Sequence, residues 1–205
     1  MYLNQVDPSL PIMIMHDDAR TLVHFIFGLS DEPEQRTFGF SHYLAIKAAH
    51  KHLHPARVLL HHHHVPRGRW WAHALPLLEL RHVELERSIF GRPLAHAAHR
   101  ADVLRLRLLI EHGGIYLDLD VVVLRPMAPL LAAGGADFVI GREGDAEHGG
   151  LHGLCNAVLL SRPNASFARR WLEEYHSFGT GDGDPWSDHS VQRPVQLAAA
   201  HPDEV

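Results

Sequence analysis

Two consecutive glycines, Gly113 and Gly114, constrain the fold of this chain more than any other feature. The preceding residues 93–112 have the apolar spacing of a helix, and the glycines supply a left-handed stop at its end. Residues 115–124 follow at once and are apolar apart from two aspartates, so they are predicted to form a buried strand. Carboxylates in the middle of such a strand need a physical reason.

Asp118 and Asp120 are those aspartates. Because side chains alternate along a strand, Tyr116, Asp118 and Asp120 share one face, with Cα atoms of the two aspartates roughly 7 Å apart. We expect both carboxylates to face a cleft at the carboxyl-end side of a central strand. Together they could hold Mg²⁺ or Mn²⁺, whose other ligands would be substrate phosphates. The alternative is that they are merely solvated where the strand leaves the core, and the apolar residues on both sides argue against it.

The N-terminal half predicts the class of fold. Thr21–Gly28 has the composition of a buried strand, residues 41–54 have helical spacing, and Arg57–Leu60 is the next strand. This βαβ opening favours a Rossmann-like α/β sheet flanked by helices, with ligands beyond the carboxyl ends of the strands. Further strands are predicted at 82–85, 137–140 and 154–160, and a further helix at 167–178.

Composition bounds the remaining possibilities. A chain of 205 residues with 46% apolar content fits one globular domain. A formal net charge of -5 argues against a protein that coats nucleic acid or an anionic membrane, although 20 histidines make the charge sensitive to pH. The single cysteine, Cys155, excludes an intrachain disulfide and a zinc site of paired cysteines. The N-terminal apolar run Ile12–Met15 is too short for a transmembrane segment.

Asp102 and Arg105 lie three residues apart on the predicted helix, so they share a face and could reach one ligand as acceptor and donor. Their spacing alone is explained better by an ordinary surface ion pair.

The segment Ala101–Arg105 followed by GGIYLDLD resembles the core of the DXD-containing glycosyltransferases of the sugar-binding family, glycosyltransferase family 32. That family includes yeast Golgi mannosyltransferases, bacterial capsule and lipooligosaccharide enzymes, and the glucosylating domains of large clostridial toxins. The strand His24–Phe27 and the later pair Asn156–Ala157 occur in the same order as in the family. The likeness covers roughly residues 21–205.

The resemblance implies a GT-A fold, which is a Rossmann-like mixed sheet flanked by helices in a single domain. It also implies a nucleotide-sugar donor, a divalent metal that is commonly Mn²⁺, and a glycan or lipid-linked acceptor. Transfer with retention of the anomeric configuration is expected for the same reason. The reaction would belong to polysaccharide biosynthesis.

The resemblance also assigns roles to individual residues. Asp118 and Asp120 would be the catalytic pair that organises the metal and the diphosphate. Donor binding would fall to four side chains, Phe27, Asp102, Arg105 and Asn156. Phe27 would stack on the base and Asn156 would lie near the transferred sugar. Relatives often have tryptophan at the Phe27 position, so the preferred nucleotide stays open.

Residues 1–20 match nothing in the family and are expected to be a lead-in to the domain at 21–205. Family members usually continue past the region matching HPDEV with another strand and a segment that helps to close the donor site. This chain stops at Val205, so it is either a fragment or an enzyme with an incomplete lid. With no anchor in the sequence, the expected location is the cytoplasm, at or near a membrane-borne acceptor.

Two other classes of function compete with this interpretation. YLDLDVVVL also suits the nucleophile strand of a haloacid-dehalogenase-like phosphatase, with Asp118 as nucleophile. That strand normally opens the fold, and this chain has no lysine after Lys51 to bind phosphate. A non-catalytic metal- or nucleotide-sugar-binding fragment is suggested by His61–His64, but neighbouring histidines on a strand alternate faces. Trp70 and Trp71 are equally consistent with an acceptor groove and with ordinary packing.

Overall fold

A single mixed sheet forms the centre of the computed structural model, which describes residues 21–32, 37–133, 135–144, 151–180 and 186–205. The strands stand in the order β3-β2-β1-β6-β8-β7. Their bounds are Leu22–Phe27 (β1), Arg57–His62 (β2), Glu79–His82 (β3), Gly114–Leu117 (β6), Phe138–Gly144 (β7) and Leu151–Ser161 (β8). β1 pairs in parallel with β2 and β6, whereas β8 runs antiparallel to β6 and β7. The predicted GT-A type mixed α/β sheet is confirmed.

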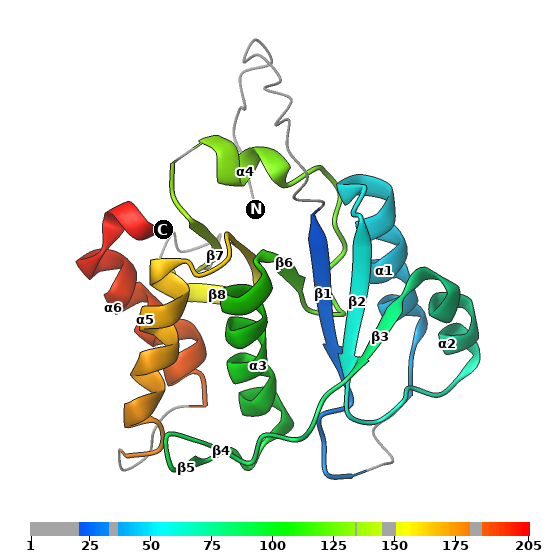
Figure 1. Ribbon diagram of the computed structural model, residues 1–205, viewed down its shortest axis with the longest axis horizontal. Helices are drawn as coiled ribbons and strands as arrows, with labels where there is room; N and C mark the ends of the chain where they lie inside the picture. The colour runs from blue at the N-terminus through cyan, green and yellow to red at the C-terminus, as the bar shows by residue number, and fades with distance from the viewer. Residues whose placement is uncertain (1–20, 33–36, 134, 145–150, 181–185) are drawn as a thin grey trace.

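Helices cover both faces of the sheet (Figure 1). Their bounds are Phe40–Leu53 (α1), Arg69–Ala74 (α2), Ala97–His112 (α3), Ala128–Ala133 (α4), Ser166–Glu174 (α5) and Arg193–Ala200 (α6). A short hairpin of β4 (Ser88–Ile89) and β5 (Arg92–Pro93) precedes α3. Among the described residues, no helix combines the length and the apolar composition that crossing a bilayer requires.

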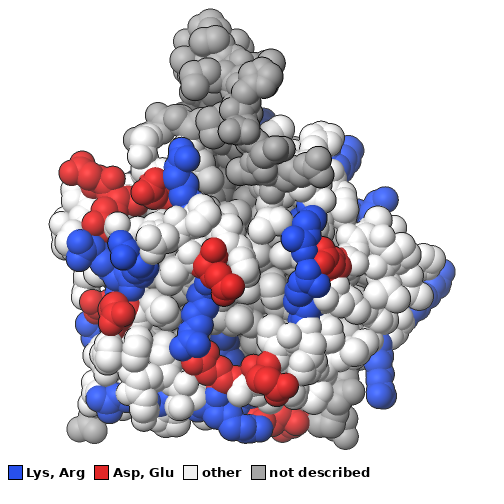
Figure 2. All heavy atoms as spheres, in the orientation of Figure 1, with Lys and Arg blue, Asp and Glu red and all other residues white. Residues whose placement is uncertain are grey.

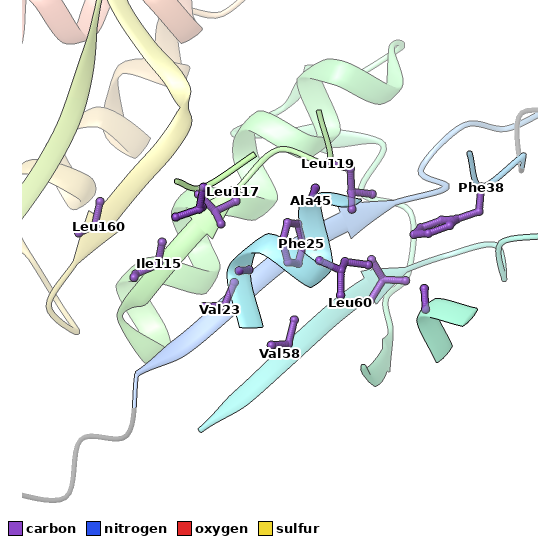
Figure 3. Close-up of a cluster of buried hydrophobic side chains, with 14 residues drawn as sticks. Val23, Phe25, Phe38, Ala45, Val58, Leu60, Ile115, Leu117, Leu119 and Leu160 are labelled. Carbon is purple, nitrogen blue, oxygen red and sulfur yellow. The ribbon is translucent and has the colours of Figure 1, made fainter. Parts of the chain in front are cut away.

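Strand alternation divides the core into two clusters. Val23 and Phe25 of β1 pack with α1 and α2 in one cluster, which Figure 3 shows. Ile26 and Tyr116 point to the other face, where α3 and α5 supply many of the apolar side chains. The sheet is therefore buried on both faces, which leaves the ends of its strands as the place for a ligand cleft.

The predicted Asp-bearing strand is shorter than its sequence pattern indicates. β6 ends at Leu117, and Asp118 donates its backbone N–H to the carbonyl of Ala157 at the limit of the ladder. The N–H of Val121 then bonds to the carbonyl of Asp118, which turns the chain out of the sheet. The predicted strand at 115–124 was therefore wrong in its second half. Those later apolar residues were misread because Val121 and Val123 pack against the first core cluster from outside the sheet.

Three other elements also differ from expectation in their boundaries. Pro93 belongs to β5, and α3 begins four residues later, at Ala97, so the predicted helix start at Pro93 was wrong. The strand expected at 82–85 lies at Glu79–His82, because its register is set by pairing with β2. The helix expected at 167–178 comprises α5 and a following tight turn at Tyr175–Ser177.

The glycine pair has the role predicted for it. Gly113 ends α3 with a φ of 65°, and Gly114 starts β6 with a φ of 99°. A Cβ atom on Gly114 would lie 2.6 Å from the backbone oxygen of Leu22 in β1. The absence of a side chain at Gly114 is therefore what allows β6 to reach its neighbour.

A chain of neutral histidines ties β2 to β1 and to the end of α3. His24 and His61 are 0% and 4% exposed. The carbonyl of Gly113 can only accept, so His24 Nε2 donates to it at 3.1 Å and His24 Nδ1 accepts from His61 Nε2 at 3.0 Å. Burial lowers the pKa of His24 to about 4 and that of His61 to about 3.

We expect Gly114→Ala to lower the free energy of unfolding by roughly 2–5 kcal/mol, because left-handed strain adds to overpacking against Leu22. Gly91→Ala is the matched control: its φ is also positive, at 76°, but nothing lies within 4 Å of the added Cβ. That variant should lose only about 1–2 kcal/mol. Urea unfolding measures both, and equal losses would show that the approach to Leu22 is not limiting.

Acid should weaken the fold through the histidine chain. In the unfolded chain these histidines take up protons near pH 6.5, well above their folded pKa values. Their contribution to stability is therefore full above about pH 6.5 and is lost as the pH decreases. His61→Gln keeps an N–H donor but does not titrate, so the free energy of unfolding of the variant should decrease less steeply than that of the parent. The two slopes should differ by up to ~1.4 kcal/mol per pH unit. Urea unfolding at pH 7 and pH 5 measures the difference. Parallel losses in the parent and the variant would contradict a neutral, buried His61.

Candidate functional site

A cleft of about 340 Å³ opens at the carboxyl ends of β1 and β6. Its walls come from four segments, which are Ile26–Leu29, His42 of α1, the alanines Ala97, Ala98 and Ala101 of α3, and Asp118–Asp120. The carboxyl ends of the strands are where a Rossmann-like sheet binds its ligands.

Figure 2 shows acidic and basic side chains interspersed over the face in view, without a broad patch of one sign.

Asp118 and Asp120 occupy the turn that follows β6, and both line the cleft. Asp120 is exposed, whereas the side chain of Asp118 is 32% exposed. The turn brings the two carboxylates to the same cavity after the strand has ended. Both of the roles predicted for these aspartates, ion binding and simple solvation at the end of the strand, place them at this turn, so their part in ion binding stays a prediction.

A buried polar network stands directly behind Asp118. Arg105 lies 3.2 Å from Asp102 and 3.3 Å from Asp118, measured between nitrogen and carboxylate oxygen. Its guanidinium also donates to the backbone carbonyl of Asn156 at 2.8 Å, and its Cζ lies 4.5 Å from the ring centre of Tyr116. A single arginine therefore joins α3 to both β6 and β8.

The other members of the network complete its hydrogen bonds. The side-chain amide of Asn156 donates to Asp102 at 2.7 Å, and the Tyr116 hydroxyl donates to Asp118. Burial raises the pKa of Asp102, while Arg105 and Asn156 oppose that shift. Burial also raises the pKa of Tyr116, so its hydroxyl keeps the proton that it donates.

Asp102 and Arg105 are 8% and 5% exposed, so the surface ion pair that their spacing favours was wrong. Neither residue lines the cleft itself, because the alanines of α3 form that part of the wall. The structure thus brings Asp102, Arg105 and Asn156 together behind Asp118. Asp102 and Asn156, which share a hydrogen bond, are 54 positions apart in the sequence.

Phe27 lies at the end of β1 and lines the cleft. Its ring is held edge-on by Phe38 and His42, each 5.6 Å away between ring centres. Phe38 is buried, so the position of Phe27 is fixed from behind. Phe27 therefore contributes a half-buried aromatic side chain to the wall of the cleft.

His42 is a cleft residue to which the sequence analysis gave no role. Its Nδ1 accepts the backbone N–H of Gly39 at 3.2 Å, which places the proton of the neutral ring on Nε2. Burial lowers the pKa of His42, and Asp120 opposes the shift. The one sequence signal for a role of His42 is its place in the first turn of a predicted helix. That signal is weak, because many histidines occupy such positions.

The carboxylates suit a magnesium or manganese ion that shares a substrate phosphate. Such ions commonly bind through one or two carboxylates and complete their shell with phosphate and water oxygens. Within the described ranges, no three or more His, Cys, Asp or Glu side chains are grouped to hold a metal on their own. Among the described residues, His61–His64 therefore gives no support to the hypothesis of a non-catalytic metal-binding protein.

Trp70 and Trp71 were predicted either to line an acceptor groove or to pack. Both are partly buried against the first core cluster, and Trp71 stacks edge-on with Phe38 at 5.4 Å. Neither lines the cleft. Packing is therefore what the structure shows for this pair.

Residues 78–135 match the family described as "Glycosyltransferase sugar-binding region containing DXD motif". The curated protein Glucan organizing enzyme 1 of Cryptococcus neoformans var. grubii is 42% identical over 190 residues, which is 89% of this chain. The match covers 50% of that protein, so the chain spans about half of its length.

Two solved glycosyltransferases share the fold. PaToxG glycosyltransferase has a TM-score of 0.58 at 12% identity, over 88% of this chain and 69% of its own. GlyE of Streptococcus pneumoniae TIGR4 has a TM-score of 0.51 at 14% identity, over 87% of this chain and 43% of its own. Identities this low carry the likeness of fold and no more.

Arg105→Met should lower the free energy of unfolding by roughly 3–5 kcal/mol, because it leaves the buried Asp102 without a counter-charge. Asp102 would then take up a proton more readily, so the deficit relative to the parent should be smaller at pH 5 than at pH 7. Urea unfolding at both values measures it.

The control is Arg107→Met, on the same helix. Arg107 pairs with Glu86 at 2.7 Å, but its side chain is 48% exposed, so the loss should stay within about 1 kcal/mol. A similar loss in both variants, or a deficit that does not depend on pH, would contradict the buried network.

Proposed function

We propose that this chain, which belongs to the glycosyltransferases with a DXD-containing sugar-binding region, transfers a sugar from a nucleotide-sugar donor to a hydroxyl group of a glycan. The observation that carries the proposal is the pair Asp118 and Asp120 at one cleft, with Arg105 directly behind Asp118. Residues 78–135, the part that matches the family, contain all three.

The donor would lie along the cleft from β1 to α3. We place the base against Phe27, whose ring Phe38 and His42 hold, and the diphosphate beside Asp118 and Asp120. Following the family, Asp102, Arg105 and Asn156 would serve the ribose or the transferred sugar. Their contacts in this chain also support a positioning role, in which Arg105 fixes the direction of the Asp118 carboxylate.

A divalent cation held by the two aspartates would stabilise the negative charge that develops on the departing diphosphate. The protein's own part is to hold the Asp118 carboxylate at a fixed position, while the exposed Asp120 stays open to the ion. The Tyr116 hydroxyl and Arg105 do this for Asp118. No separate nucleophilic side chain is required for this chemistry.

Retention of configuration and a role in polysaccharide assembly are further parts of the proposal. Retention rests on the family resemblance. The name of the curated relative refers to glucan, which supports a polysaccharide acceptor for this chain as well. The ion is proposed as Mn²⁺ or Mg²⁺ because carboxylates and phosphates are oxygen ligands.

Metal and donor should strengthen each other's binding, because each supplies ligands to the other. Asp120→Asn should abolish the Mn²⁺-dependent binding of the donor. It should leave the fold intact or slightly more stable, because two neighbouring carboxylates repel without a cation. Calorimetric titration with UDP-, GDP- and CMP-sugars, with and without MnCl₂, measures the coupling.

Asp137→Asn is the matched control, since Asp137 is an exposed acid that pairs with Arg162 and does not line the cleft. It should bind donor and metal like the parent. Donor binding that needs no metal and survives Asp120→Asn would overturn the mechanism. Hydrolysis of a phosphomonoester with an aspartyl-phosphate at Asp118 would instead favour the phosphatase.

A further inference from the structure

A second cavity of about 250 Å³ adjoins the donor cleft. It lies between the loop after β1 and the start of α3, with Asp31, Glu32, His96 and Arg100 among its walls. Ala97 lines both cavities, so they share a wall at the first turn of α3. A ligand in the second cavity would therefore lie next to one in the cleft.

Arg100 makes this cavity a built feature of the fold. The residue is 4% exposed and donates to the carbonyls of Leu29 and Leu94 at 2.9 and 3.0 Å. It also pairs with Asp31 at 2.7 Å. These bonds fasten the loop after β1 to the segment before α3, so the cavity walls are held from the inside.

An exposed tryptophan extends the cavity at its rim. Trp186 is 59% exposed, although its ring centre lies 4.8 Å from His96 and 4.4 Å from His99. His99 is backed in turn by Phe178 at 5.0 Å. The indole is thus supported by neighbouring rings while much of its surface stays open to solvent. His96 connects this surface to the cavity, because it contacts the indole and also lines the cavity.

The chemistry of the cavity favours an uncharged ligand with many hydroxyl groups. The charge of Arg100 is already engaged by Asp31, and Asp31 also pairs with Arg87 at 2.8 Å, so the balanced charges give a phosphate or carboxylate little attraction. Carboxylates, a serine hydroxyl and imidazoles can accept or donate bonds to sugar hydroxyls. A flat aromatic surface suits the C–H face of a pyranose ring, through the same attraction that orders aromatic contacts in proteins.

We propose that Trp186 and the cavity beside His96 bind the neutral terminal sugar of the acceptor glycan. This subsite rests on the proposed glycosyl transfer, because its position next to the donor cleft is what would bring an acceptor hydroxyl to the donor. The donor cleft needs a cation to balance its aspartates. In the acceptor subsite, Asp31 is already paired with Arg100 and Arg87.

The test uses neutral trisaccharides of glucose, mannose and galactose as acceptors for the Mn²⁺-loaded protein and its nucleotide-sugar. One of these trisaccharides is expected to act as acceptor. For that trisaccharide, Trp186→Ala should raise both the KM and the dissociation constant about tenfold. Its kcat and the Mn²⁺-dependent binding of the donor should change little. Trp186→Phe keeps an aromatic face and should recover part of the affinity.

Leu124→Ala is the control, because Leu124 is a 74% exposed apolar side chain that lines neither cavity. It should behave like the parent. Three outcomes would overturn the subsite: trisaccharide binding unchanged by Trp186→Ala, donor binding lost in that variant, or no trisaccharide bound by the parent at millimolar concentration. Trisaccharide binding that depends on Trp186, in a protein that binds no nucleotide-sugar, would keep the subsite and reject the transferase.

Discussion

The buried guanidinium of Arg105 is the interaction on which the functional end of the molecule depends. It carries a full charge inside the core and satisfies it with Asp102 and Asp118, while the Asn156 carbonyl accepts a further hydrogen bond. These partners come from the helix, from the end of β6 and from β8. The sheet changes from parallel to antiparallel pairing between those two strands, so the arginine fixes the point where the topology switches.

Fixing that point has consequences for the cleft. Asp118 can face the cavity because its rear oxygen is already engaged by Arg105 and by the Tyr116 hydroxyl. Asp120, two residues later, is exposed and retains its freedom to meet a ligand. One carboxylate is thus held by the protein and the other is open, which is a suitable arrangement for gripping an ion that arrives with its substrate.

Local patterns predicted much of the fold but little of the network. The βαβ opening and the glycine stop followed from spacing, because alternation and left-handed caps are properties of short segments. The end of β6 did not, because Val121 and Val123 pack on the core without joining the sheet. Asp102 and Arg105 looked like a surface pair, since no local signal reveals that Asn156 completes their contacts.

The alanines of α3 give this architecture a property of a different kind. Ala97, Ala98 and Ala101 present only methyl groups to the cleft, while Asp102 and Arg105 of the same helix work behind its wall. The width of the cavity and the charge network are therefore encoded by separate positions of one helix. Substitutions at these alanines can narrow or reshape the cleft, one methylene at a time, without disturbing the groups that hold the Asp118 carboxylate. The shape of the cleft and the charge network behind it can thus diverge independently within a single element.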